Sequence, residues 1–414
     1  MLQNLQVKIP RQRDFFRFRI TPQNSAKLPS GTIAAMKIPS LGSVGIVLTL
    51  LLAFIAELYR FHGYLLLDLF VPLFVATWLA IKLYKKQIPQ LPHTLLPAVL
   101  FAGLGLASLL LNSAGMSTSD FISSAFYGIR FVSLYALSVI VMNQTSEEKK
   151  QIFWGLALFT LLLSVAGFIQ LQIQPDFTSF EDLGWDPHQN RLLSTWFDPN
   201  FVGGFLAFSI PLLLGVGLDE KSLRKFLFPI VGLASIALVL TLSRSAYLAF
   251  AAALFIFGFF RSLKLLAAMG VGLILLVAFI PSVQDRFVSL TENFESFFTE
   301  TYTLPDASAR LRFASWDEAW ELFKEKPLLG HGYNRYKFAA LELGTLDDLE
   351  IHSASGSDSS LLNILATTGL AGFFPFLVVY LLLAVHAFKY RKNGFALGFL
   401  AGLCGLFIHS IFVN

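Results

Sequence analysis

Charged residues are scarce in this sequence. Asp, Glu, Lys and Arg make up only 14% of its 414 residues, whereas soluble domains carry about 25%. So few charges cannot cover the surface of a soluble fold of this size, and they also exclude a disordered chain or a charged coiled coil. The single cysteine, Cys404, excludes a disulfide-stabilised secreted domain.

Hydrophobic residues, in contrast, make up 55% of the chain and collect in long runs. A helix needs about 20 mainly apolar residues, range roughly 17–25, to cross a bilayer. The sequence therefore predicts an all-α polytopic membrane protein with about eleven transmembrane helices. The predicted spans are 41–58, 64–81, 95–111, 121–142, 151–171, 202–217, 226–242, 245–260, 265–281, 359–386 and 394–412.

Basic residues predict the orientation of these spans. Alternate short loops are basic, such as the one holding Lys82, Lys85 and Lys86, and the acidic residues lie mostly on the opposite side. By the positive-inside rule the N-terminus is cytoplasmic. Residues 1–40 form a basic tail without the early apolar core of a cleavable signal peptide.

The remaining organisation follows from the spans. Residues 41–281 hold the first nine predicted helices and an outer loop at 172–201, and residues 359–414 hold the last two. A long extracytoplasmic loop, 282–358, lies between them. Within this loop 313–325 has the spacing of an amphipathic helix, and Asp285–Thr301 is a second candidate.

Three arginines on the outer face have distinctive settings. Arg191 precedes the sixth span, Arg244 lies in a very short turn between two apolar runs, and Arg312 lies in the long loop. Guanidinium groups bind phosphate oxygens in a bidentate manner, so together they favour an anionic ligand such as a pyrophosphate. The alternatives are snorkelling to lipid headgroups for Arg244 and ordinary loop salt bridges for the other two.

Arg130 lies inside the fourth predicted span, where a charge needs a partner. For this residue we favour a structural role, in which it bridges to a neighbouring helix.

Five short motifs, in this order, resemble the O-antigen ligase and O-antigen polymerase family over about residues 185–375. They are RLLSTWFDPN (Arg191–Asn200), SRS (Ser243–Ser245), RFASW (Arg312–Trp316), PLLGHG (Pro327–Gly332) and DSSLLNILATTGLAG (Asp358–Gly372).

The resemblance implies a type C membrane glycosyltransferase of the bacterial cytoplasmic membrane, with its active site on the extracytoplasmic face. Such enzymes transfer a glycan from an undecaprenyl-pyrophosphate carrier to the hydroxyl of a glycan or lipid acceptor. They use no metal or nucleotide sugar. Direct displacement of the carrier would invert the anomeric configuration, and we expect no cofactor and no nucleic-acid partner. Twelve spans are usual in the family, so eleven would fit a missing last helix.

Carried over by position, Arg191, Arg244 and Arg312 match the arginines assigned to the donor's pyrophosphate. Asp198 and Asn200 match a D-P-N turn at the head of a helix, where Asn200 as a helix cap is the structural alternative. The motif glycines Gly330 and Gly332 are assigned a structural role.

One position departs from the family pattern. Where ligases of the family place a histidine, eleven residues before the first glycine of the GLAG ending, this chain has Asp358. Asp358 can act on the acceptor hydroxyl in its place, or His352 or His331 can supply an imidazole. Alternatively, Asp358 only caps the following helix, and the two histidines are ordinary loop residues.

Two other classes of protein share parts of this pattern. A lipid-linked glycan flippase is also polytopic, although transporters often contain internal repeats, and we find none. A non-catalytic component of a polysaccharide assembly complex would bind the carrier lipid through the same arginines but would tolerate loss of Asp358.

Overall fold

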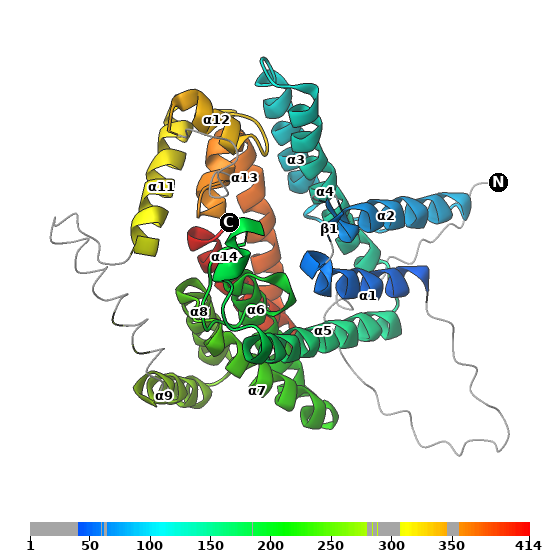
Figure 1. The fold of residues 1–414 in the computed structure, drawn as a ribbon. Helices are drawn as coiled ribbons and strands as arrows, with labels where there is room; N and C mark the ends of the chain where they lie inside the picture. The colour runs from blue at the N-terminus through cyan, green and yellow to red at the C-terminus, as the bar shows by residue number, and fades with distance from the viewer. Residues whose placement is uncertain are drawn as a thin grey trace, which may run out of the picture.

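The computed structural model describes residues 40–58, 60–61, 64–183, 185–279, 284, 288, 307–345 and 356–414, and nearly all the regular structure in these ranges is helical (Figure 1). The α-helices are α1 (Leu41–Phe54), α2 (Leu66–Tyr84), α3 (Leu95–Leu111), α4 (Thr118–Met142), α5 (Ser146–Ile173), α6 (Pro199–Asp219), α7 (Arg224–Leu240), α8 (Arg244–Arg261), α9 (Leu263–Phe279), α11 (Ala307–Glu325), α12 (Tyr336–Leu343), α13 (Ser360–Lys389) and α14 (Gly394–Phe412). Short 3-10 turns cover Ala56–Leu58, Thr178–Leu183, Ser194–Trp196 and Lys221–Leu223, and one small hairpin pairs β1 (Arg60–Phe61) with β2 (Tyr64–Leu65).

The apolar runs form helices because a helix satisfies its own backbone N–H and C=O groups in lipid. Each of the eleven predicted spans falls on a helix, although 265–281 extends beyond the described residues. In the described part of the chain, 8 helices are long and apolar enough to cross a membrane. The shorter apolar helices are Leu41–Phe54, Leu95–Leu111 and Leu263–Gly272. The all-helical membrane architecture is therefore confirmed, and the count of eleven stays a prediction.

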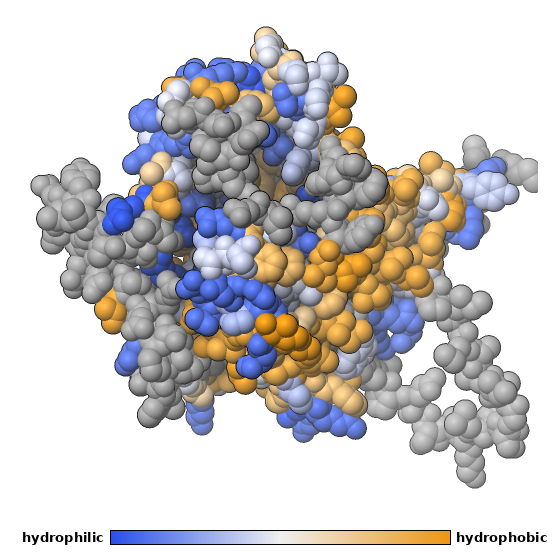
Figure 2. Space-filling view, in the orientation of Figure 1, coloured by the Kyte–Doolittle hydropathy of each residue, from blue (hydrophilic) through white to orange (hydrophobic). Residues whose placement is uncertain are grey.

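The surface agrees with this architecture. Large apolar side chains are exposed along the helices, including Leu73, Leu111 and Val385. Figure 2 shows hydrophobic residues over α1 and α2. A soluble protein rarely exposes so much contiguous apolar surface, so lipid is the natural environment of this face.

The most tightly packed part of the bundle consists of α6, α8 and α14. Small residues let their backbones approach, because a Cβ atom at Gly398 of α14 would overlap the carbonyl oxygen of Pro211 and lie 2.6 Å from the Cα of Leu212. Gly405 of α14 faces Ala249 of α8 in the same way. Since Gly394 meets Gly215 and His409 meets Gly204, α14 runs antiparallel to α6.

The starts of α6 and α8 consequently lie together, at the end of the bundle where α14 finishes. Gly203 near the start of α6 faces Ala246 near the start of α8. The start of α13 joins them, because the N–H and Oγ of Ser360 both donate to the carbonyl oxygen of Val413, at 3.2 and 2.7 Å. We call this the convergent end of the bundle: the starts of α6, α8 and α13 with the end of α14.

The opposite end of the same helices is tied by Asp219. Its Oδ2 accepts from the backbone N–H of Gly394 at 2.5 Å, and its Oδ1 lies 2.8 Å from Nη1 of Arg261. Arg224 donates to the last carbonyl groups of α6, at Gly217 and Leu218, each at 2.9 Å. These contacts fix the positions of α6, α8 and α14 relative to one another. They therefore also fix the positions of the helix ends at the convergent end.

Substitution Gly398→Ala is expected to lower the stability of this core by about 1–3 kcal/mol, because the added methyl meets backbone atoms that cannot rotate away. Gly232→Ala on α7 is the matched control, since a Cβ atom there meets nothing within 4 Å. The midpoint of thermal unfolding in detergent, followed by tryptophan fluorescence, measures both. Equal midpoints for the two variants would contradict the close packing of α14 on α6.

Arg130 of α4 pairs with Asp68 of α2, with 3.0 Å between Nε and Oδ1, and Asp68 is buried. The interpretation of Arg130 as a bridge to a neighbouring helix is confirmed.

Two helices of the long loop, α11 and α12, pack on α13 (Figure 1). The predicted amphipathic helix at 313–325 is confirmed as part of α11, whose Ala319 and Leu322 are fully buried against Ala366 of α13. The second candidate, Asp285–Thr301, lies outside the described residues apart from Val288.

Candidate functional site

The first part of the site is the turn at the start of α6. Oδ1 of Asp198 accepts from the backbone N–H groups of Asn200 at 2.6 Å and Phe201 at 3.2 Å, so Asp198 is the N-cap. Pro199 stands at the first helical position, where its missing N–H costs nothing. The expectation that Asn200 caps this helix is wrong, because Asp198 takes that role and Asn200 lies inside the first turn.

The second part is the three-residue turn between α7 and α8. Ser243 caps α8 by accepting from the N–H of Ala246 at 3.4 Å, and its Oγ donates to Oδ1 of Asn200 at 2.7 Å. Oγ of Ser245 lies 3.1 Å from Oγ of Ser243. Arg244 follows the cap as the first residue of α8. The predicted D-P-N and S-R-S motifs are thus joined by a direct hydrogen bond.

Arg191 is attached to the same turn. Its Nε donates to the carbonyl oxygen of Thr241 at 2.9 Å, and the N–H of Leu192 donates to the carbonyl oxygen of Leu240 at 2.9 Å. Nη1 of Arg191 lies 3.4 Å from Nδ1 of His188. Two of the three predicted arginines therefore flank one short turn.

Arg312 and Asp358 form the third part, from α11 and the residues before α13. The N–H of Asp358 donates to Oγ of Ser315 at 2.8 Å, which ties this segment to α11. Desolvation by its surroundings raises the pKa of the Asp358 carboxyl, and the positive charge of Arg312 opposes that rise.

Asp358 does not cap α13. Ser359 does, because its Oγ accepts from the N–H of Leu362 at 3.4 Å and α13 begins at Ser360. The capping alternative for Asp358 is therefore wrong: the shorter serine side chain sits one residue closer to the helix and takes the N–H. The Asp358 carboxylate therefore takes no part in capping α13.

Electrostatic coupling joins the three parts. Burial has the largest effect on the pKa of Asp198 and raises it. Hydrogen bonds from the backbone N–H groups of Asn200 and Phe201 lower this pKa. The negative charge of Asp186 raises it further, and the positive charge of Arg191 lowers it. Asp186 also raises the pKa of Asp358. Because one carboxylate acts on both groups, the outer loop before α6 and the segment before α13 lie near each other at the convergent end.

The PLLGHG motif lies against a break inside α13 and has a structural task there. Helix α13 is broken at Gly369, whose φ of 61° and ψ of −168° suit only glycine. The freed N–H groups of Leu370 and Ala371 donate to the carbonyl oxygens of Pro327 at 2.9 Å and Leu328 at 3.0 Å. The motif thus replaces hydrogen bonds that the break removes.

The second half of the motif forms hydrogen bonds to the part of α13 that precedes the break. The N–H groups of His331 and Gly332 donate to the carbonyl oxygens of Ala366 at 3.0 Å and Thr367 at 2.8 Å. Gly330 and Gly332 have φ values of 67° and 114°, and a Cβ atom on Gly330 would lie 2.5 Å from the backbone of Thr367. These glycines let the loop lie flat against the break.

His331 is buried in this junction, with Nε2 2.9 Å from the carbonyl oxygen of Leu322 and 3.6 Å from Oε2 of Glu325. Burial lowers the pKa of its imidazole. The charges that act on it belong to Glu325, Lys326 and Arg335, and none of these belongs to the convergent end. The geometry thus favours a packing role for His331. His352 lies outside the described residues.

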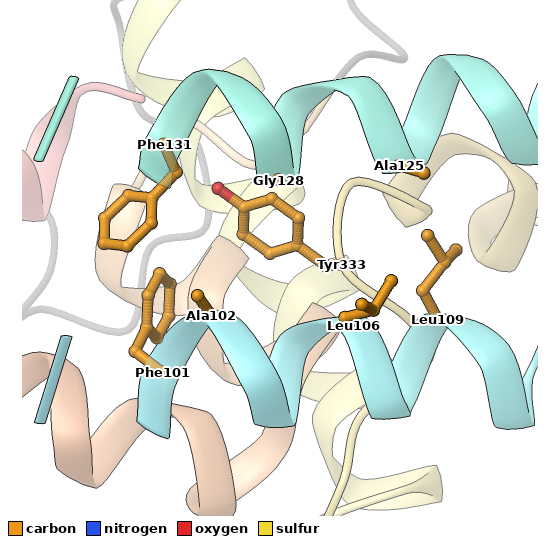
Figure 3. Close-up of a pocket in the computed structure, with 8 residues that line it drawn as sticks. All are labelled: Phe101, Ala102, Leu106, Leu109, Ala125, Gly128, Phe131 and Tyr333. Carbon is orange, nitrogen blue, oxygen red and sulfur yellow. The ribbon is translucent and has the colours of Figure 1, made fainter. Parts of the chain in front are cut away.

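Tyr333, next in the same loop, inserts between α3 and α4 (Figure 3). Its ring borders a cavity of about 20 Å³ lined by apolar residues such as Phe101, Leu106 and Phe131. Burial raises the pKa of Tyr333 to about 12. A cavity of this size holds about one water molecule and is too small for a glycan. The inserted Tyr333 ring therefore serves to anchor the loop between α3 and α4.

One residue of the convergent end escaped the sequence analysis. His409, in the last turn of α14, is only 6% exposed. It forms a hydrogen bond with the backbone of Asn200, and the positive charge of Arg312 acts on it. A polar residue in an otherwise apolar run was the available signal, because such residues are rare in spans and usually have a task.

Together these observations define an integral membrane protein with arginines and carboxylates gathered where three helices begin. Residues 229–377 match the family model described as O-antigen ligase. This match supports the O-antigen ligase resemblance that the motifs predicted. The matched region includes Arg244, Arg312 and Asp358, whereas Arg191, Asp198 and His409 lie outside it. No curated protein matches the chain. In the described residues, no group of three or more His, Cys, Asp or Glu side chains is arranged to hold a metal ion.

Proposed function

We propose that this protein is a membrane glycosyltransferase of the O-antigen ligase or polysaccharide polymerase type. It transfers a glycan from an undecaprenyl-pyrophosphate carrier to an acceptor hydroxyl, without a metal or a nucleotide sugar. The observation that carries this proposal is the convergence of Arg191, Arg244 and Arg312 in a protein with an O-antigen ligase region.

The arginines bind the pyrophosphate of the donor. Their forked N–H groups match phosphate oxygens, and the starts of α6, α8 and α13 add the partial positive charge of helix N-termini. The three arginines come from three separate segments of the chain, so the anion is contacted from several directions. This favours a large group with two phosphates over a single carboxylate.

The bound pyrophosphate is also the leaving group. As the bond to the anomeric carbon breaks, negative charge grows on the departing oxygen, and fixed cations in a desolvated site stabilise that charge. The acceptor oxygen attacks from the opposite side, which inverts the anomeric configuration. Asp358, coupled to Arg312 and free of helix capping, orients or deprotonates the acceptor hydroxyl.

Orientation follows from the charges at the two ends of the core helices. Arg224, Arg261 and Lys389 lie at the end opposite the arginines of the site. Basic residues mark the cytoplasmic side, so the convergent end faces the extracytoplasmic side of the bacterial cytoplasmic membrane. A carrier lipid in that leaflet places its pyrophosphate at the level of the site.

The test is transfer by the purified protein in liposomes that contain lipid-linked glycan and an acceptor. We expect a new glycosidic bond and released carrier pyrophosphate, and Asp358→Ala should lower the rate by about 10²–10⁴-fold. Movement of the lipid-linked glycan between leaflets without bond formation would instead identify a transporter. An unchanged cellular glycan profile in the Asp358→Ala variant would favour a non-catalytic assembly component.

A further inference from the structure

His409 is the least expected polar group at the convergent end. Its side chain is 94% buried at the end of α14, and its Nε2 has no hydrogen-bond partner in the described structure. A buried nitrogen left without a partner destabilises the fold, so its retention indicates a ligand that supplies the missing hydrogen bond. The chain makes room for the ring at Gly204, where a Cβ atom would lie 2.9 Å from Cε1 of His409.

The other ring nitrogen determines the tautomer. Since Nε2 is unpaired, the bond between the imidazole and the backbone of Asn200 is made by Nδ1. The N–H of Asn200 already donates to Asp198, at 2.6 Å, so the remaining backbone partner is the Asn200 carbonyl oxygen. A carbonyl accepts, and therefore Nδ1 carries the hydrogen. The lone pair of the neutral imidazole lies on Nε2.

Cationic groups lie near that lone pair. Arg312 of α11 acts electrostatically on His409. Among the described residues, the other charged groups at this end of the helices packed on α14 are Asp198 at α6, Arg244 at α8 and Asp358 before α13. The unpartnered Nε2 of His409 therefore lies at the same end of the bundle as the arginines.

We propose that Nε2 of His409 accepts the proton of the acceptor hydroxyl, and that Asp358 orients this hydroxyl. This inference rests on the proposed function and names its general base. The acceptor oxygen forms a bond to the anomeric carbon, the bond from that carbon to the pyrophosphate oxygen breaks, and its electron pair leaves with the pyrophosphate. The proton moves from the acceptor oxygen to Nε2 and then to the departing pyrophosphate. Substrate brings the missing hydrogen-bond donor to Nε2, because catalytic hydrogen bonds are often completed only in the substrate complex.

Substitution His409→Gln tests the role, because glutamine can donate to the Asn200 carbonyl but cannot take up a proton. We expect kcat to fall by about 10²–10⁴-fold, with little change in the KM for the lipid-linked donor and in thermal stability. The fall in kcat/KM on acidification should disappear in this variant. His386→Gln, at the other end of α13, is the matched control and should behave like the wild type.

The outcomes separate the two proposals. A wild type that transfers glycan and a His409→Gln variant with near-normal kcat would overturn the role of His409 and leave the proposed function intact. Loss of the acidic limb in Asp358→Asn, with its retention in His409→Gln, would assign the base to Asp358. Nitrogen-15 NMR of the histidines gives a readout without turnover: we expect His409 as the Nδ1–H tautomer, and an Nε2–H tautomer would overturn the proposal.

Discussion

Replacement of Arg312 or Arg244 by alanine is expected to lower glycan transfer by about 10²–10³-fold, because each removal deletes a fixed donor to the departing pyrophosphate. In water such a loss would be small, since solvent screens the charge and replaces the hydrogen bonds. At the convergent end the neighbouring carboxyl groups are desolvated strongly enough for burial to be the main influence on the pKa values of both Asp198 and Asp358. Initial rates with purified lipid-linked glycan, at saturating acceptor, measure the effect.

The matched control for Arg312 is Arg310, which is exposed on the same helix two residues earlier. Arg310→Ala removes the same charge from α11 and should retain most of the wild-type rate. Arg312→Lys keeps the charge but loses the forked geometry, so its rate should lie between those of the wild type and Arg312→Ala. Near-normal turnover in both Arg312→Ala and Arg244→Ala would refute the arginine site.

The spans were predictable because lipid leaves the backbone little choice. A run such as 394–412 must satisfy its own hydrogen bonds, and the structure gives α14 the same bounds, Gly394–Phe412. The sequence also indicates the arginines and Asp358 as candidates, the arginines by their settings on the outer face and Asp358 by its position in the family motif. Their motifs alone did not show how they meet: the hydrogen bond from Ser243 to Asn200 spans 43 residues of sequence.

Other features depend on which helices pack together, and the sequence does not determine that in a simple way. His409 belongs to the site only because α14 lies antiparallel to α6, an arrangement set by close contacts at Gly398 and Gly215. The choice of caps was wrong at Asn200 and Asp358 for a local reason. Asp198 and Ser359 are equally good capping residues, and the exact start of each helix decides between neighbours.

The break in α13 was not predicted either, because GLAG is compatible with a continuous membrane helix. Gly369 shows its role only in the structure. Its φ of 61° is strained for any other residue, and a Cβ atom there would overlap the carbonyl group of Leu328 and lie 2.6 Å from the nitrogen of Leu329. The PLLGHG loop cannot retreat, since it is fixed by its own hydrogen bonds to Ala366 and Thr367.

Substitution Gly369→Ala is therefore expected to lower the free energy of unfolding by about 4 kcal/mol or more, through backbone strain, steric overlap and loss of the exchanged hydrogen bonds. Gly103→Ala on α3, which packs on α13, is the matched control because a Cβ atom there meets nothing within 4 Å. Thermal unfolding in detergent compares the two. Because α13 also carries Asp358 to the arginines, any Gly369→Ala protein that folds should lose transfer activity, whereas Gly103→Ala should keep it. Equal unfolding midpoints would show that α13 can form a continuous helix at residue 369. That result would contradict the structural role of the PLLGHG loop.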